Sequence, residues 1–337
     1  MTLPAPLPGA QLRDDGPLLD RFGRAHTYLR VSVTDRCNFR CTYCLPEDGL
    51  TWKPRDTLLT FEEIARLASV FHGLGVRRVR LTGGEPLLRS DLHMLVRLLA
   101  DLGFDDLSLT TNGHRLVEDA PRLAAAGLRR VNVSCDAIDP VVFSRMTRGG
   151  DVRRVLQGID AARAAGLTPI KVNAVLVEGE NDDAPLALLE HFAPHAADTI
   201  VRFIESMPFE RAARPALPGS RVRALLATRY HLEPIGGGDG GPAVDWRVAE
   251  TGQRVGFVSP MTEHFCERCN RLRLEADGHL RTCLSRDETP PLRELLRANA
   301  SDDALARAIR GMVWGKVAGH EAHLGTAFEG VMTRIGG

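Results

Sequence analysis

The sequence predicts an α/β fold, a partial (β/α)6 barrel of parallel strands whose open side is covered by a C-terminal α+β region. Six β-rich segments alternate with helical segments, the connections are short, and the alternation stops near residue 207. Alternation with short connections requires parallel strands joined by right-handed crossovers. Six such units are fewer than the eight that close a full barrel, so we expect an open, TIM-like sheet.

The periodicity of the apolar residues places the individual elements. Apolar, β-rich runs predict strands over residues 28–33, 76–81, 106–110, 130–135, 169–177 and 199–204. A helical period predicts helices over residues 60–74, 91–102, 116–126, 152–165 and 184–192. Thr60 and Glu63 have the spacing of a capping box at the start of the first helix. After residue 207 we expect two short strands within residues 247–258 and helices over 291–296 and 303–313.

Composition and charge exclude several classes of protein. The chain has 337 residues, with 43 basic and 43 acidic side chains, so its net charge is zero. That balance argues against a general nucleic-acid or membrane-surface binder, and no apolar run approaches the 18 residues of a membrane span. We expect a flexible, Pro-rich leader over 1–19, which is not a signal peptide, the barrel core over 20–207, and a substrate-binding region over 208–337. The Gly-rich run 235–242 has no phosphate-loop context, and we expect it to be flexible.

Six of the seven cysteines form two groups of three. The first group follows the first strand, the second lies near residue 275, and their members are Cys37, Cys41 and Cys44, then Cys266, Cys269 and Cys283. Clustered, reduced cysteines indicate metal ligands. Three thiolates leave one corner of a four-iron cluster open for an exogenous ligand. The alternative is zinc, completed in the second group by His264 or His279. Cys135 lies on a predicted strand, and we expect it to be structural.

Basic residues occupy positions where strands should be buried. Arg30, Arg80 and Lys171 lie within predicted barrel strands, and Arg271 and Arg273 share one face of a predicted strand between Cys269 and Cys283. Because a buried, unpaired charge costs several kcal/mol, several cations facing one cavity require an anion. A triphosphate fits, since arginine binds phosphate through two hydrogen bonds. The alternative is a set of ion pairs with Glu85, Asp136 and Glu205.

Two segments resemble the radical S-adenosylmethionine (SAM) enzymes. They are residues 31–44, which carry the first cysteine group, and residues 81–86, Leu-Thr-Gly-Gly-Glu-Pro. The resemblance implies that the first group holds a 4Fe–4S cluster whose open iron binds SAM. It implies that Gly83 and Gly84 allow close backbone approach to SAM, and that the other SAM contacts are Tyr43, Ser134 and Met207. Without the resemblance, Tyr43 is equally well explained as an ordinary half-buried aromatic residue.

From residue 20 to the C-terminus the chain resembles the GTP 3′,8-cyclase family of molybdenum cofactor biosynthesis. The matching segments are 22–24, 28–30, 110–113, 171–173, 203–205, 256–261 and the terminal Gly336-Gly337. The resemblance implies a second 4Fe–4S cluster on Cys266, Cys269 and Cys283, and a tail that reaches the active site. It implies catalytic roles and GTP contacts for Arg30, Arg80, Lys171, Arg271 and Arg273, and further GTP contacts from Thr111 and Leu272. The departures are Arg78, where lysine is common, and Cys135, where an aliphatic residue is usual.

The activity that this resemblance implies is a radical SAM lyase reaction. GTP would be converted to (8S)-3′,8-cyclo-7,8-dihydroguanosine 5′-triphosphate, the first step of molybdenum cofactor biosynthesis, with SAM and two 4Fe–4S clusters as cofactors. The implied partners are a one-electron donor such as flavodoxin or ferredoxin and the downstream cyclic pyranopterin monophosphate synthase. The implied setting is the cytoplasm, without a membrane, and the chain could pair as a homodimer. The alternatives are a peptide-modifying radical SAM enzyme with an auxiliary cluster and a non-catalytic zinc-binding module.

Overall fold

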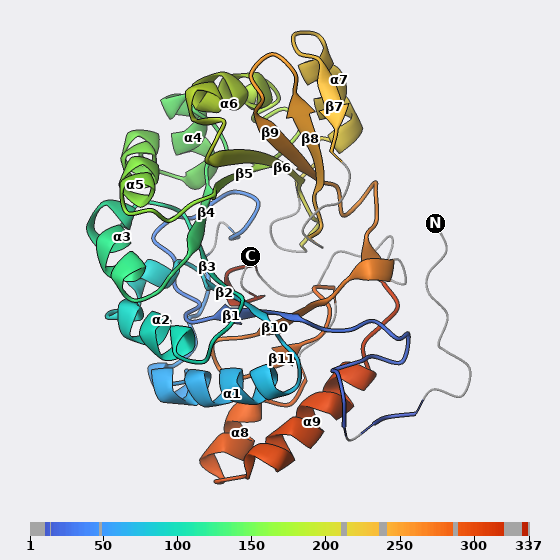
Figure 1. The fold of residues 1–337 in the computed structure, drawn as a ribbon. Coiled ribbons are helices and arrows are strands. Elements are labelled where there is room, and N and C mark those ends of the chain that lie inside the picture. Colours follow the sequence, from blue (N-terminus) through green and yellow to red (C-terminus); the bar gives the residue numbers. More distant parts are fainter. Residues whose placement is uncertain are drawn as a thin grey trace.

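A single curved sheet runs through the part of the chain that the structure describes (Figure 1). The computed structural model describes residues 11–13, 15–46, 49–209, 214–235, 241–285, 289–319 and 332–335. The sheet has eleven strands in the order β11-β10-β1-β2-β3-β4-β5-β6-β9-β8-β7. Its centre consists of β1 (Tyr28–Ser32), β2 (Arg78–Thr82), β3 (Asp106–Thr111), β4 (Arg130–Ser134), β5 (Ile170–Leu176) and β6 (Thr199–Glu205). Neighbouring strands from β1 to β6 are parallel, which confirms the predicted β/α succession.

The C-terminal region extends this sheet at both edges. At one edge β10 (Arg271–Leu274) is parallel to β1, and β11 (Leu280–Arg281) is antiparallel to β10. At the other edge β9 (Arg254–Val258) is parallel to β6, and β8 (Val244–Val248) and β7 (Leu232–Pro234) continue it antiparallel. The sheet is therefore open, as predicted for a partial barrel. The C-terminal region was expected to cover the open side, and the structure shows in addition that it lengthens the barrel wall.

The helices pack on the outer face of the sheet (Figure 1). The expected helices are α1 (Phe61–Gly73), α2 (Leu92–Ala100), α3 (Leu116–Ala125), α5 (Val152–Ala164) and α6 (Ala184–Phe192). Two further helices, α4 (Pro140–Thr147) and α7 (Gly219–Ala227), were not predicted. Helix α4 is short, and its start is fixed by the Asp139 side chain, which accepts hydrogen bonds from two backbone amides. A single cap and eight residues give too little periodicity to identify from sequence.

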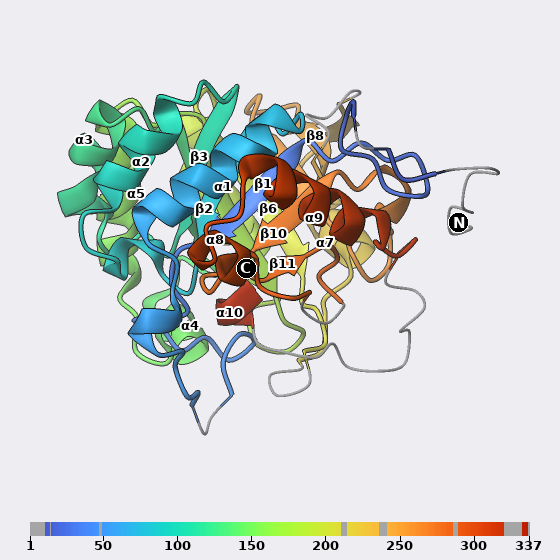
Figure 2. The ribbon, with the colours of Figure 1, turned by 90° about the horizontal axis from the view of Figure 1, so that it is seen from below.

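The last helices return to the beginning of the barrel. They are α8 (Leu292–Arg297), α9 (Asp302–Trp314) and α10 (Met332–Ile335). Helix α9 packs beside α1, as two views show (Figures 1 and 2). The C-terminal part of the chain therefore lies against the N-terminal strands of the sheet.

Side-chain alternation along the strands separates an apolar outer face from a polar inner face. Leu29 and Val31 of β1 are fully buried with Ile64, Leu67 and Phe71 of α1 in the main core. The predicted capping box is present, because the Thr60 hydroxyl accepts from the Glu63 amide and the Glu63 carboxylate accepts from the Thr60 amide. The inner face is left for the functional site. No helix in the described part of the chain is long and apolar enough to cross a membrane.

Candidate active site

A cavity of about 330 Å³ follows the inner face of the sheet and is lined by all six cysteines of the two groups. Cys269 comes directly before β10, which is parallel to β1 and in register with it from Tyr28 onward. Cys37 comes after the C-terminal end of β1. The two cysteine groups therefore lie toward opposite ends of the cavity, separated by the length of β1. Two metal clusters could face one shared space from these positions.

The first cysteine group lies on a loop that neighbouring loops hold in place. The Cys44 amide donates to the Cys41 carbonyl at 3.0 Å, which closes a turn around the group. The Asn112 side-chain amide approaches Cys37 Sγ at 4.0 Å from the loop after β3. Arg148, in a left-handed backbone conformation, donates to the Leu45 carbonyl at 3.0 Å. Three separate loops therefore determine where these sulfurs point.

Gly83 and Gly84 have a structural role that was not predicted. A Cβ on Gly83 would lie 2.6 Å from the Thr34 carbonyl oxygen, and one on Gly84 would lie 2.3 Å from that of Arg36. The Gly84 amide donates to the Thr34 carbonyl, and the Glu85 amide donates to that of Arg36, both at 2.7 Å. The two glycines are therefore required for contact with the segment that leads into the cysteine loop. Both also line the cavity, where the expected SAM contact stays a prediction.

Burial has the largest effect on the pKa values of the cysteines in the first group. It raises the pKa of the Cys37 thiol to about 12, and the nearby Glu85 raises it further. Burial also raises the pKa values of Cys41 and Cys44, with a further contribution from Asp136. Thiols in such surroundings become thiolates when a strongly bound cation compensates the charge. The donor set is therefore suited to a metal cluster and would be a poor free nucleophile.

One cysteine of the second group, Cys269, has the opposite electrostatics. Cys266 and Cys269 flank the 3-10 turn η4 (Cys266–Arg268), and Cys283 Sγ lies 3.3 Å from the Ser285 hydroxyl. Burial raises the pKa of Cys269, but the cations Lys316 and Arg271 outweigh it and lower the pKa to about 6. This thiol is thus ready to bind a metal near neutral pH.

The geometry of the described side chains gives no support to a preformed zinc site. No group of three or more His, Cys, Asp or Glu residues in the described ranges is close enough to hold a single metal ion. The two histidines that could complete zinc in the second group have other contacts. His264 Nδ1 lies 2.8 Å from the Pro260 carbonyl, and His279 Nδ1 lies 3.0 Å from Asp277 Oδ1. Three thiols around an open space fit a larger cluster with one free corner.

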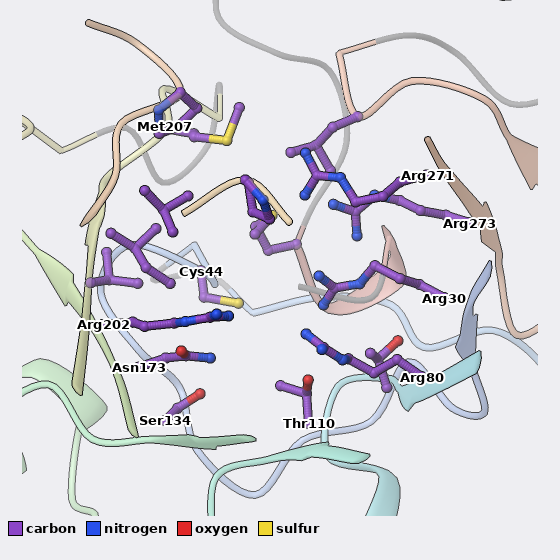
Figure 3. Close-up of a pocket in the computed structure, with 18 of the residues that line it drawn as sticks. Arg30, Cys44, Arg80, Thr110, Ser134, Asn173, Arg202, Met207, Arg271 and Arg273 are labelled. Carbon is purple, nitrogen blue, oxygen red and sulfur yellow. The ribbon is translucent and has the colours of Figure 1, made fainter. Parts of the chain in front are cut away.

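Arginines form one wall of the cavity, and the strand register explains how. Arg30 pairs in register with Arg273 of β10 on one side and with Arg80 of β2 on the other. These three guanidinium groups therefore lie side by side on the inner face. Arg271 lies two residues before Arg273 on the same face and stacks over the Phe265 ring at 4.8 Å. Figure 3 shows all four reaching into the cavity from one side.

The arginines of this wall destabilise one another's positive charge. Burial lowers the pKa of Arg30 well below its usual value, and the neighbouring Arg273 and Arg80 lower it further. Burial also lowers the pKa of Arg80, and lowers that of Arg273 to about 9 with a contribution from Arg271. Cations that destabilise one another in this way create a strong site for a polyanion.

The three carboxylates that could have neutralised this wall have other partners. Glu85 accepts from the Leu87 and Asn112 amides and from the Thr111 hydroxyl. Asp136 accepts from the Tyr43 hydroxyl at 2.8 Å and from the Val175 amide. Glu205 accepts from the amides of Gly219, Met261 and Thr262. The alternative of ion pairs between these acids and the arginine wall therefore finds no support in the described contacts.

Most of the residues predicted for SAM and GTP line this cavity. They include Tyr43, Gly84, Thr111, Ser134 and Met207. Two predicted residues do not reach its surface. Lys171 is buried on the same face of β5 as the cavity residue Asn173, one layer below. Leu272 alternates with Arg271 and Arg273, so its side chain is buried in the outer core and points away from the cavity.

Several cavity residues were missed by the sequence reasoning. Arg202 of β6 and Asn173 of β5 face the arginine wall from the opposite side (Figure 3). Arg281 also lines the cavity, and its Nε donates to Glu275 at 2.8 Å. Arg202 could have been found, because it interrupts the otherwise apolar run Thr-Ile-Val-Arg-Phe-Ile of β6. Cys135 is fully buried in the core and does not line the cavity. Gly336 and Gly337, and residues 236–240 of the Gly-rich run, lie outside the described residues.

Comparison with protein families defines the class of this protein. Residues 31–192 match the Radical SAM superfamily and residues 199–322 match Molybdenum Cofactor Synthesis C. The first match contains Cys37, Cys41, Cys44 and the Gly83-Gly84 turn, and the second contains the other three clustered cysteines. The protein is a radical SAM enzyme, a class that uses SAM together with iron–sulfur clusters.

Comparison with curated relatives identifies the family. The GTP 3′,8-cyclase of Rhodopseudomonas palustris (strain TIE-1) is 47% identical over 315 residues, which cover 91% of this chain and 90% of the relative. The GTP 3′,8-cyclase of Rhizobium etli (strain CIAT 652) is 48% identical, with 91% and 89% covered. The chain belongs to the GTP 3′,8-cyclase family. This membership argues against the peptide-modifying and zinc-module alternatives.

A solved structure supports the fold. SuiB from Streptococcus suis, crystallised with S-adenosylmethionine, matches with a TM-score of 0.60 at 15% identity. The match covers 85% of this chain and 68% of SuiB. At this identity the likeness concerns the fold alone, and it agrees with the open barrel described above.

Proposed function

We propose that this chain converts GTP to (8S)-3′,8-cyclo-7,8-dihydroguanosine 5′-triphosphate as the first step of molybdenum cofactor biosynthesis. Family membership supports the reaction, and one structural observation supports the assignment of residues to it. Both cysteine groups and the in-register row Arg273, Arg30 and Arg80 line the same cavity. A polyanionic substrate held by the row would lie between the two cysteine groups.

The proposal assigns one cluster to each cysteine group and SAM to the first. Cys37, Cys41 and Cys44 would hold a 4Fe–4S cluster, which together with SAM would supply the radical chemistry for removing the hydrogen atom at C3′ of the GTP ribose. The chain's own task is placement, because the reacting atoms must be held within roughly 3–3.5 Å of each other. Gly84, Tyr43, Ser134 and Met207 are the proposed SAM contacts. The Tyr43 hydroxyl is fixed by Asp136, which makes its ring a rigid wall for a planar base.

The proposal assigns substrate binding and stabilisation of the intermediate to the basic residues. Arg30, Arg80 and Arg273 bind the triphosphate, since arginine pairs with phosphate oxygens through two hydrogen bonds. Arg271 lies nearest the second cysteine group and so contacts the part of GTP that faces it. Lys171 adds positive charge from one layer below, Thr111 contributes its hydroxyl, and Leu272 contributes its backbone. Arg202 joins the set from the opposite wall.

The partners and setting of the reaction are also part of the proposal. The reaction needs a one-electron donor, such as flavodoxin or ferredoxin. Its product would be consumed by cyclic pyranopterin monophosphate synthase. We propose that this takes place in the cytoplasm, and that the chain pairs as a homodimer. These statements are supported by family membership.

Anaerobic turnover tests the proposed function. The reconstituted protein is incubated with SAM, dithionite and GTP, and the products are separated and analysed by mass spectrometry. We expect 5′-deoxyadenosine together with a product that has the mass of GTP and a different retention time. ATP in place of GTP should give no such product. Formation of 5′-deoxyadenosine without consumption of GTP would reject GTP as the substrate.

A further inference from the structure

A lysine is buried directly behind the second cysteine group. Lys316, two residues after α9, has a side chain among the largest that are fully buried, and the whole residue is only 2% exposed. Its Nζ donates to the Arg271 carbonyl at 2.8 Å and approaches Cys269 Sγ at 3.8 Å. Among the described residues, no carboxylate lies within ion-pair distance of this ammonium group. The thiolate of Cys269 is therefore its closest anionic partner.

Hydrogen bonds from Arg24 hold the segment that carries Lys316 in place. Arg24 donates to the Cys266 carbonyl at 2.8 Å, to the Ala318 carbonyl and to the Val317 carbonyl, both at 2.6 Å. Asp20 orients Arg24 by accepting from its Nε at 2.7 Å. These bonds attach the segment that carries Lys316 to the turn that carries Cys266. These contacts hold the segment in place, and the buried ammonium group lies beside the sulfur.

In the part of the chain that the structure describes, the charged side chains that act on the first group are acidic. The polar side chains beside these sulfurs are neutral: the Asn112 amide lies 4.0 Å from Cys37 Sγ, and Tyr43 contacts Cys41. Glu85 and Asp136 are the charged groups that act on those thiols. Cys269 therefore lies in a field opposite in sign to the field that acts on the thiols of the first group. Hydrogen bonds and charge at the sulfur ligands are among the main determinants of the potential of an iron–sulfur cluster.

We propose that Lys316 is a positioning residue that raises the reduction potential of the cluster held by Cys266, Cys269 and Cys283. This rests on the proposed function, which assigns a cluster to those cysteines. One-electron reduction adds a negative charge to the cluster and its thiolates. A fixed ammonium at Cys269 stabilises that added charge, so the reduced form is favoured. The same ammonium holds the Arg271 carbonyl, and so couples the cluster to a proposed substrate residue.

A redox titration of the intact, reconstituted protein tests this proposal. The midpoint of each cluster is followed by electron paramagnetic resonance, with dithionite as reductant and without SAM or GTP. In Lys316→Met, reduction of the second cluster should become at least tenfold less favourable, a shift of about 59 mV to lower potential for one electron. Lys316→Arg should restore most of the shift. The first cluster is an internal control, and its midpoint should not move.

A matched control distinguishes the effect of losing the Lys316 contact with sulfur from the effect of removing any buried cation. Arg310 lies on the adjacent helix α9, is 7% exposed and donates to the carbonyls of Gly16 and Pro17 rather than to a cysteine. Arg310→Met should leave both midpoints unchanged. An unchanged second midpoint in Lys316→Met, with the cluster loaded, would overturn the proposal. Iron content, close to eight per chain, shows independently whether the second cluster is present.

A second measurement covers the case in which Lys316→Met does not load its cluster. The chain contains three lysines, Lys53, Lys171 and Lys316. Wild-type protein labelled with 15N-lysine is examined by electron–nuclear double resonance, with the second cluster reduced. We expect a 15N coupling at this cluster that persists in Lys53→Arg and disappears in Lys316→Arg. No coupling in the wild-type protein would overturn the proposal, whereas absence of the cluster signal itself would refute the proposed function instead.

Discussion

Arg30 illustrates how one residue can serve binding at the expense of stability. It lies between Arg273 and Arg80 in the strand register, and burial together with these neighbours lowers its pKa. A polyanion relieves this repulsion when it binds. In the free protein, however, the charge of Arg30 is unfavourable. Its presence is therefore explained by the ligand and not by the fold.

Arg30→Gln separates these two effects. We expect the affinity for GTP to fall at least tenfold, since a hydrogen bond to a charged group contributes about 1.5–3 kcal/mol. The thermal midpoint of the nucleotide-free protein should stay the same or rise, because one of three adjacent charges is removed. Calorimetric titration with GTP and thermal unfolding measure the two quantities. Arg66→Gln, at a partly exposed ion pair with Asp302, is the control. Unchanged GTP affinity in Arg30→Gln would remove Arg30 from the site.

His26 gives a residue-scale prediction for pH. It is buried, and burial lowers its pKa from 6.5 to about 4, partly offset by its hydrogen bond to Asp20 at 3.0 Å. Between pH 4 and 6.5 the unfolded chain binds a proton that the folded chain does not bind, so stability falls as the pH is lowered through this window. Above pH 6.5 the contribution is complete. The shift corresponds to about 3 kcal/mol.

The substitution His26→Gln should flatten this dependence, because glutamine can still donate to Asp20 but does not titrate. Urea unfolding of the metal-free protein at pH 7.5 and pH 5.0 measures the difference. The matching substitution at the exposed His231 is the control. An equally steep loss of stability in His26→Gln would show that another group causes it.

At the scale of elements, the Gly83-Gly84 turn links β2 to the cysteine loop. An added Cβ at Gly84 would meet the backbone of Asp35 and Arg36, which cannot move without shifting the loop that follows. Gly84→Ala should therefore lower the iron content from about eight to about four per chain, one 4Fe–4S cluster, because the first group is displaced. Gly311→Ala, in an open position within α9, should keep the iron and add up to about 1 kcal/mol of stability. Full iron content in Gly84→Ala, measured alongside circular dichroism, would contradict this role of the turn.

The elements also show what the sequence could predict. All six central strands were placed within two residues of their observed start, because each is a short apolar run that ends at a turn signal. The edge positions of β10 and β9 could not be predicted. They depend on pairing between segments that are far apart in sequence, here Tyr28 with Arg271 and Ile200 with Arg254. Local periodicity contains no information about such partners.

The residues of the candidate site could be predicted from the sequence to a similar extent as the strands. The cysteine spacing and the unusual arginines in strands identified most of the cavity lining. Alternation on β10 could have shown that the Leu272 side chain faces away, since it lies between two arginines that face inward. Lys316 could not have been found, because a single lysine after a helix has no distinguishing pattern. Only the fold places it beside Cys269.

At the scale of the whole molecule, the sheet places the two cysteine groups at opposite ends of one cavity. The first group follows the end of β1, and the second lies beside its beginning. The division of the chain at residue 207 stays a prediction, and the sheet continues across it through β6 and β9. The arginine wall lies between the two groups. We therefore propose that GTP binds in this cavity with its ribose facing the proposed SAM site.

Deuterium transfer tests this claim most directly. GTP that carries deuterium at C3′ of the ribose is incubated anaerobically with SAM, dithionite and the protein containing both clusters. We expect 5′-deoxyadenosine to gain one deuterium and the nucleotide product to lose it, because C3′ would face the 5′-carbon of the bound SAM adenosyl group. Deuterium retained at C3′, with unlabelled 5′-deoxyadenosine as the product, would contradict this placement of GTP.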